Sequence, residues 1–218
     1  RATQRIFSAM RLVQHETGVY PHLHVARGCQ TEEGISGRKG VRSVLRYAVL
    51  WLQVIFARIS SRFLFHPQHS SLHTTARVTT GVLKKFAGKF DVLHLHWLGD
   101  FSLSIEEIGK SPAPVVWTLH DMWPYCGAEH QTPTDRFING YLPTNRPTGE
   151  TGPDVNRATW ERKKVSWKRL PTIVAPSAWS AENVRASALL KFALIRELPH
   201  PIDTSFWAPP EQLEQMSG

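Results

Sequence analysis

Four short apolar segments alternate with segments of helical period between residues 90 and 198. The apolar segments are DVLHLHW, APVVWTLH, TIVAP and KFALIREL, and the segments between them are SIEEIGK, ATWERKKVSWKRL and SAWSAENVRASALL. Strands that are apolar on both faces and are separated by helices are typical of a parallel sheet covered by helices. The sequence therefore predicts an α/β fold with an open, mostly parallel sheet and helices on both faces.

The N-terminal part of the chain is less regular. The segment RIFSAMRLVQHETGV has apolar residues at helical spacing, and Gly18 is a plausible stop. PHLHVA is then expected to be a short strand, and GCQTEEGISGRKG a loop. Residues 41–62 are the most hydrophobic segment, but their apolar stretch is shorter than the roughly 20 residues that span a bilayer. Two interpretations remain for this segment, a helix packed on the sheet and an interfacial helix flanked by arginines.

Size and charge limit the classes of protein that need to be considered. A chain of 218 residues is long enough for one substantial α/β domain and short for two. Two distant cysteines give no disulfide framework, which fits a reducing compartment. Residues 1–89 hold 14 Lys and Arg against 3 Glu, a balance that suits a phosphate-bearing or membrane-associated partner. There is no nucleic-acid-binding motif, so nucleic acid is not an expected partner.

Polar and aromatic side chains follow three of the predicted strands at their carboxyl ends. In open parallel sheets, ligands bind at this edge, so the side chains are expected to line one cleft. Residues 131–156 form a polar, Pro- and Gly-rich segment too long for a plain connection, which indicates a functional or partly mobile loop. The residues at the strand ends are His94, His96, Trp97, His120, Asp121, Ser177 and Trp179.

Several catalytic chemistries can be weighed against this set. The His94-x-His96 pair lies on one face of a strand and can ligate zinc or iron, with His120, Asp121, Glu129 and His130 to complete a site. No HExxH or CxxC motif supports such a metal, and the chain has no G-x-S-x-G elbow, P-loop or G-x-G-x-x-G motif. Ser177 is better explained as a helix N-cap than as a nucleophile. The aromatic residues near the cleft can stack on a sugar ring or an apolar lipid tail; they are Trp97, Trp123, Tyr125 and Trp179.

Four ordered motifs resemble those of a known family. FDVLHLHW, PVVWTLHDMWPYCGAEH, IVAPSAWSAENVRASALL and LPHPIDTSFWAPP, in this order and spacing, closely resemble the N-terminal half of bacterial family 4 glycosyltransferases. The resemblance covers roughly residues 1–210 and is strongest from Phe90 onward. It implies a GT-B fold, in which two Rossmann-like domains face each other across a cleft, and places this chain in the first of them.

The resemblance also implies an activity and a site. It implies a retaining transfer of a sugar from a nucleotide-sugar donor to a polysaccharide or lipid-linked acceptor, without a metal or other cofactor. His120 matches a family histidine beside the reacting centre and is the expected catalytic residue, and Asp121 would hold its ring or a sugar hydroxyl. Such an enzyme would be cytoplasmic, at the inner face of the membrane, and would build cell-envelope polysaccharide. The expected acceptor-side residues are His96, Trp97, Asp121, Met122, Trp123, Ser177 and Trp179.

The chain departs from the family pattern in several places. It seems to begin inside the helix that follows the first strand and Gly-rich loop, so residues 1–198 are expected to form the acceptor-binding domain without them. Residues 199–218 resemble the linker to an absent nucleotide-sugar domain, and His200 replaces the usual Asn. This polypeptide alone is therefore expected to have little transferase activity. Two alternatives stay open, a non-catalytic sugar- or lipid-binding module and a metal hydrolase built on the His-x-His pair.

Overall fold

The computed structural model describes residues 2–25, 34–36, 48, 52, 55, 73–99, 102–202 and 204. Apart from Ala48, Leu52 and Ile55, the apolar segment 41–62 lies outside these residues, as does most of the predicted linker 199–218. The described elements are α1 (Ala2–Leu12), α2 (Gln14–Thr17), β1 (Leu23–His24), β2 (Ile35–Ser36), α4 (Val82–Phe86), β3 (Leu93–Leu95), α5 (Ile105–Gly109), β4 (Val115–Thr118), α6 (Arg136–Asn139), η1 (Pro143–Asn145), α7 (Val155–Ser166), β5 (Thr172–Ala175), α8 (Ala178–Ala186) and β6 (Ile195–Glu197).

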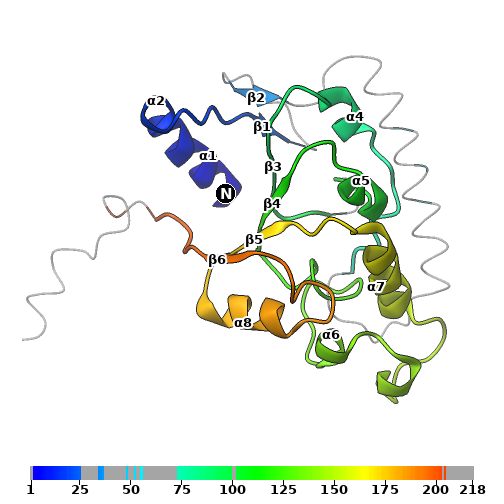
Figure 1. Cartoon of the computed structure of the whole chain (residues 1–218). Helices are drawn as coiled ribbons and strands as arrows, with labels where there is room; N and C mark the ends of the chain where they lie inside the picture. The colour runs from blue at the N-terminus through cyan, green and yellow to red at the C-terminus, as the bar shows by residue number, and fades with distance from the viewer. Residues whose placement is uncertain are drawn as a thin grey trace, which may run out of the picture.

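The principal sheet has four parallel strands in the order β3-β4-β5-β6. Strands that are consecutive in the chain are also neighbours in the sheet. Each connection runs from the carboxyl end of one strand through a helical segment to the amino end of the next, as the alternating sequence pattern predicts. The mixed α/β architecture agrees with a Rossmann-like fold. Because all four strands run in the same direction, their carboxyl ends meet at one edge of the sheet (Figure 1).

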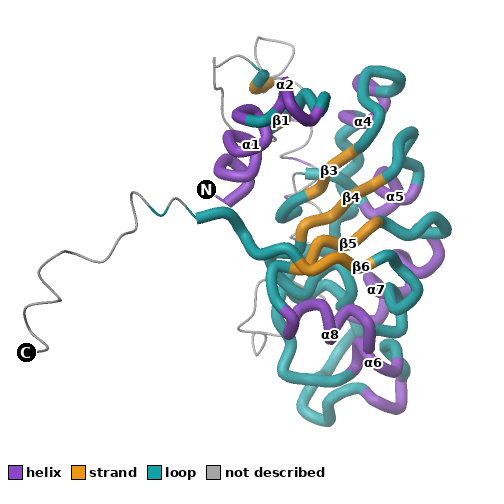
Figure 2. The backbone as a smooth tube through the Cα atoms, turned by 60° about the vertical axis from the view of Figure 1, so that its left-hand side comes forward, coloured by secondary structure: helices purple, strands orange, loops and turns teal. Residues whose placement is uncertain are grey.

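Helices lie on both sides of this sheet. Helices α4, α5 and α7 lie on one side, and α1 lies on the other, as both views show (Figures 1 and 2). Helices α5 and α7 also pack on each other. Gly109 at the end of α5 allows this approach, since a Cβ there would collide with the backbone carbonyl of Ser166.

The predicted N-terminal helix is present, and one predicted loop is corrected. Gly18 ends α2 in the left-handed conformation, with φ of 67°, which glycine adopts at little cost. PHLHVA contributes the two residues of β1, but β1 pairs with β2 in a separate two-stranded parallel sheet. Ile35 and Ser36 of β2 come from the segment that was expected to be only a loop. A single buried Ile between glycines gives too weak a period to predict a strand.

Side-chain caps fix the starts of three helices. Ser104 caps α5 in a reciprocal box with Glu107, Asp154 caps α7, and Ser177 caps α8. The cap at Asp154 starts α7 three residues before the predicted helix. Helix α8 ends four residues earlier than predicted because the backbone of Ser187 is extended, and its hydroxyl then bonds to the Val184 carbonyl.

The polar segment 131–156 is organised around a buried arginine. Only 3% of the Arg136 side chain is exposed, and its guanidinium donates to Asp154 at 2.6 Å and to Asn145 at 3.1 Å. The same group lies over the Tyr141 ring, 4.6 Å from its centroid. The segment expected to lack regular structure thus contains α6 and η1, held to the start of α7. The partners of this guanidinium lie 9 and 18 residues further along the chain, so a local sequence pattern does not reveal them.

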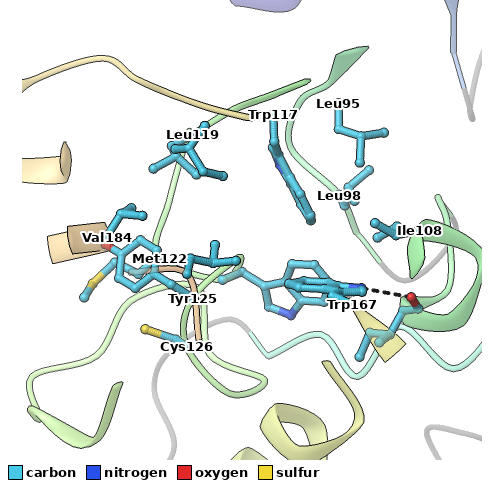
Figure 3. Packing of buried hydrophobic residues seen from close by; sticks show 14 of the residues in the cluster. Leu95, Leu98, Ile108, Trp117, Leu119, Met122, Tyr125, Cys126, Trp167 and Val184 are labelled. Atoms are coloured by element: carbon cyan, nitrogen blue, oxygen red, sulfur yellow. Dashed lines mark hydrogen bonds between the residues drawn. The ribbon is translucent and has the colours of Figure 1, made fainter. Parts of the chain in front are cut away.

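Three tryptophans form the centre of the hydrophobic core. The rings of Trp117, Trp123 and Trp167 lie 5.5 to 6.2 Å apart, centroid to centroid. Trp167 donates its indole N–H to the Ile105 carbonyl at 3.0 Å, which joins α7 to α5 (Figure 3).

Among the described residues, none of the helices is both long and apolar enough to traverse a bilayer.

Candidate functional site

A pair of hydrogen-bonded histidines lies at the carboxyl ends of β3 and β4. The parallel register places Leu95 opposite Trp117, so both chains continue past the sheet side by side. His96 and His120 follow these strand ends, and His96 Nδ1 lies 3.1 Å from His120 Nε2. The predicted convergence of the two strand ends is therefore found in the structure.

Two further imidazoles extend this pair into a row. His94 packs on His96 with the ring centroids 4.4 Å apart, and its Nε2 shares a hydrogen bond with the Thr118 hydroxyl at 2.8 Å. His200 stacks on His120, with the centroids 4.9 Å apart and the planes inclined by 14°. We call His94, His96, His120 and His200 the histidine row. The place of His200 was not predicted, since its approach to His120 depends on the path of the chain after β6.

All four imidazoles of the row favour the neutral form. Burial lowers the pKa of His94 and His200, and burial with the adjacent His200 lowers the pKa of His120. Burial and the neighbouring imidazoles lower the pKa of His96 to about 3. A neutral ring has one donor and one acceptor nitrogen. In the His96–His120 bond one ring therefore donates and the other accepts, which couples their tautomers.

Asp121 pairs with His130 rather than with His120. Its Oδ2 lies 2.5 Å from His130 Nδ1, and its Oδ1 accepts the Trp123 backbone N–H at 3.0 Å. His130 Nε2 shares a second bond with the Thr74 hydroxyl at 2.8 Å. Of the two roles expected for Asp121, a bond to the His120 ring is not the one found here, while contact with a sugar hydroxyl stays a prediction. We call Asp121, His130 and Thr74 the buried triad.

The predicted aromatic residues divide into an exposed and a buried set. Trp97 is 51% exposed and Trp179 is 62% exposed, and both follow strand carboxyl ends. Trp123 is only 1% exposed, and Met122 and Tyr125 are also buried in the core. Met122 and Trp123, which were expected on the acceptor side, are thus buried, since the loop after β4 folds inward and packs them against the tryptophan core.

A buried lysine, which the sequence did not single out, holds this loop in place. Lys163 of α7 is fully buried, and its Nζ donates to the carbonyls of Trp123, Cys126 and Gly127. The ammonium also lies 3.7 Å from the Trp123 ring centroid. Burial lowers the pKa of Lys163 to about 7. In the sequence this lysine is one of a polar series in α7, and nothing local distinguishes it from its exposed neighbour Lys164.

The remaining predicted residues lie near the start of α8. Ser177 is exposed, and its hydroxyl accepts the Ser180 backbone N–H at 3.3 Å, which confirms the N-cap role. Trp179 lies in the first turn of α8. Cys126 is fully buried, and burial raises the pKa of its thiol. Within the part of the chain that the structure describes, no group of three His, Cys, Asp or Glu side chains is arranged to hold a metal ion.

Comparison with known proteins agrees with the α/β fold. Residues 24–206, most of the chain, match the profile of Glycosyltransferase Family 4. The chain therefore belongs to Glycosyltransferase Family 4, and its function is that of a glycosyltransferase. No curated protein and no solved structure matched the chain.

Proposed function

We propose that this chain supplies the acceptor side of a retaining glycosyltransferase, with His120 at the reacting centre. The sugar would come from a nucleotide-sugar held by a second domain and would pass to a polysaccharide or lipid-linked acceptor. Residues 1–198 would then bind the acceptor, and residues 199–218 would connect the two domains. The single observation that carries the proposal is the hydrogen-bonded His96–His120 pair at the strand ends of a Family 4 chain.

The neutral state of His120 suits this role. Its lowered pKa keeps the ring uncharged near pH 7. A neutral ring can hydrogen-bond a hydroxyl group and does not repel nearby cations. The bond with His96 engages Nε2 and leaves Nδ1 as the nitrogen available for a sugar hydroxyl. His120 would then orient either the transferred sugar or the attacking acceptor hydroxyl.

The exposed residues at the neighbouring strand end complete the proposed acceptor side. Ser177 and Trp179 follow β5, and both are accessible to solvent. Trp179 offers an apolar face to an acceptor, while the Ser177 hydroxyl is shared with the start of α8. The basic N-terminal half would attract a phosphate-bearing, membrane-associated acceptor.

Turnover of the full-length enzyme, in which this chain is joined to the donor-binding second domain that the proposal requires, tests the proposal. Transfer of labelled sugar from UDP-glucose, UDP-galactose or GDP-mannose to a membrane lipid extract would be measured, with the anomeric configuration of the product read by NMR. We expect His120→Ala to lower kcat at least about tenfold, the lower range for a group that assists proton transfer or orientation. His15→Ala, at an exposed histidine of α2, serves as the matched control. Unchanged turnover in His120→Ala, or an inverted product, would contradict the proposal.

A non-catalytic sugar- or lipid-binding module remains the alternative. It predicts no transfer from any of the three donors, but measurable binding of glycans or lipid extract to the purified protein. When the full-length enzyme is assayed, the two functions therefore give opposite results for sugar transfer.

A further inference from the structure

Trp97, at the carboxyl edge of the sheet, is exposed to solvent but is packed against a neighbouring ring. Trp97 follows β3 directly after His96 and is 51% exposed. Its indole lies against the His130 ring, with the centroids 5.5 Å apart and the planes inclined by 33°. An exposed tryptophan that is packed on a second ring has a restricted orientation and loses little conformational freedom when a ligand binds.

The ring beneath Trp97 is itself fixed by the buried triad. His130 is 5% exposed, and its two nitrogens lie 2.5 Å from Asp121 and 2.8 Å from Thr74. A carboxylate only accepts hydrogen bonds, so His130 Nδ1 carries the proton and the ring cannot rotate without losing both bonds. The Trp123 indole, which donates to the Thr74 carbonyl at 2.8 Å, anchors the same segment to the core. The support of Trp97 is therefore rigid.

Gly99 leaves room for the six-membered ring of the Trp97 indole. A Cβ added at Gly99 would lie 2.8 Å from Trp97 Cη2 and 3.0 Å from Cζ3. Gly99 does not have a positive φ, so the backbone itself would accept alanine. The absent side chain therefore leaves the space that the present position of the Trp97 ring requires.

We propose that Trp97 is a stacking platform for a pyranose ring of the acceptor, and that His130 is the residue that positions it. The C–H groups on the apolar face of a sugar ring carry small positive charges, which suit the negative face of an indole. Trp97 directly follows His96, the partner of His120, so the platform lies at the same carboxyl edge of the sheet as the proposed reacting centre. This inference rests on the proposed transferase function and adds the ring contact that orients the acceptor.

Binding of simple sugars tests the platform directly. The enzyme labelled with fluorotryptophan would be titrated with methyl glucoside, methyl galactoside and methyl mannoside, and separately with UDP and UDP-glucose. Trp97→Phe assigns the Trp97 fluorine resonance by its disappearance. We expect at least one methyl glycoside to shift this resonance and to receive saturation transfer at its ring C–H protons, while UDP does neither. A shift with UDP-glucose but with none of the methyl glycosides would overturn the assignment to the acceptor.

Substitutions separate the platform from its support. Trp97→Ala should weaken methyl glycoside binding roughly threefold to tenfold, the range for a favourable ring contact, and Trp97→Phe should restore part of it. Gly99→Ala displaces the indole without altering the buried triad, and we expect the same loss. Phe192→Ala is the control, because Phe192 is 85% exposed but precedes β6, at the opposite edge of the sheet. Equal affinity in Trp97→Ala and the wild type would overturn the proposal.

The positioning role of His130 has to be measured by quantities that a mere loss of protein stability would not change in the same way. His130→Asn keeps a donor toward Asp121 but removes the ring against which Trp97 packs. We expect it to shift the Trp97 resonance in the free enzyme and to raise the KM for the membrane acceptor while changing kcat little. A lowered kcat with an unchanged KM and resonance would show that His130 does not act through Trp97.

The failure of this inference can be told apart from failure of the proposed function. If labelled sugar is transferred but Trp97→Ala and Gly99→Ala bind methyl glycosides like the wild type, the platform alone is wrong. If no donor supports transfer but Trp97 still responds to methyl glycosides, the transferase proposal fails and the platform stands as a sugar-binding surface.

Discussion

His96 Nδ1 and His120 Nε2 lie 3.1 Å apart, and each imidazole belongs to a residue that follows a different strand. Because both rings are neutral, one proton lies between the two nitrogens. Protonation of both rings would place two N–H groups face to face. The bond therefore depends on pH through both partners.

Acid should destabilise the fold through the histidine row. The pKa of His96 is about 3 in the folded protein and about 6.5 in an unfolded chain, so between these values the unfolded state binds more protons. The stability contributed by the neutral ring is complete above pH 6.5 and is lost progressively as the pH falls toward 3. Urea unfolding at a series of pH values between 7 and 4 measures this slope. His96→Gln should make the slope shallower, whereas His15→Ala should leave it unchanged; equal slopes for both variants would contradict the prediction.

Lys163 should be a major determinant of stability. Replacing it with Met preserves the length of the side chain but leaves the carbonyls of Trp123, Cys126 and Gly127 without their donor. We expect a loss of about 3 kcal/mol in the free energy of unfolding, in line with unsatisfied buried acceptors. Lys164→Met, at the exposed neighbouring position, should change stability by less than about 0.5 kcal/mol. Denaturant titration compares the two variants, and similar losses would show that the buried lysine is not the anchor.

The close approach of α5 and α7 should not tolerate a methyl group. Gly109→Ala places a Cβ against the Ser166 carbonyl, so the helices must separate, and we expect a cost of about 2 kcal/mol, typical of overpacking. Gly149→Ala is the matched control, because a Cβ there meets no atom within 4 Å. Thermal unfolding followed by circular dichroism measures both, and an unchanged Tm for Gly109→Ala would refute the steric argument.

Arg136 should control the order of residues 131–156. Arg136→Lys keeps the charge but cannot bond Asp154 and Asn145 together in the planar geometry that the guanidinium provides. We expect cleavage of this segment by trypsin or chymotrypsin at least about threefold faster than in the wild type, as local opening becomes easier. Arg169→Lys provides a control that alters the same residue type outside the clamp. Equal cleavage rates in the two variants would contradict this role.

The strand ends were predictable because they depend on a local pattern. Apolar segments that stop at His96 or His120 predict strands, and parallel topology then brings those ends together. The exposed state of Trp97 and the buried state of Trp123 were not predictable in the same way, since both are aromatic residues just after a strand. Their difference arises from Lys163, which lies 40 residues beyond Trp123 and draws the loop inward.

The hydrogen-bond partner of Asp121 also could not be predicted from a local sequence pattern. In the sequence it adjoins His120, and the family resemblance implied that it would hold that ring or a sugar hydroxyl. In the fold the carboxylate meets His130, nine residues later, because the loop after β4 returns alongside Thr74. Long-range partners of this kind depend on loop paths that no helical or strand period encodes.

The three clustered tryptophans of the core also give this protein an internal optical signal. Trp117, Trp123 and Trp167, with ring centroids 5.5 to 6.2 Å apart, are close enough for their excited states to couple. Such coupling produces circular dichroism in the near ultraviolet that requires a fixed mutual orientation of the rings. Loss of this band would report loosening of the core independently of events at Trp97 on the surface.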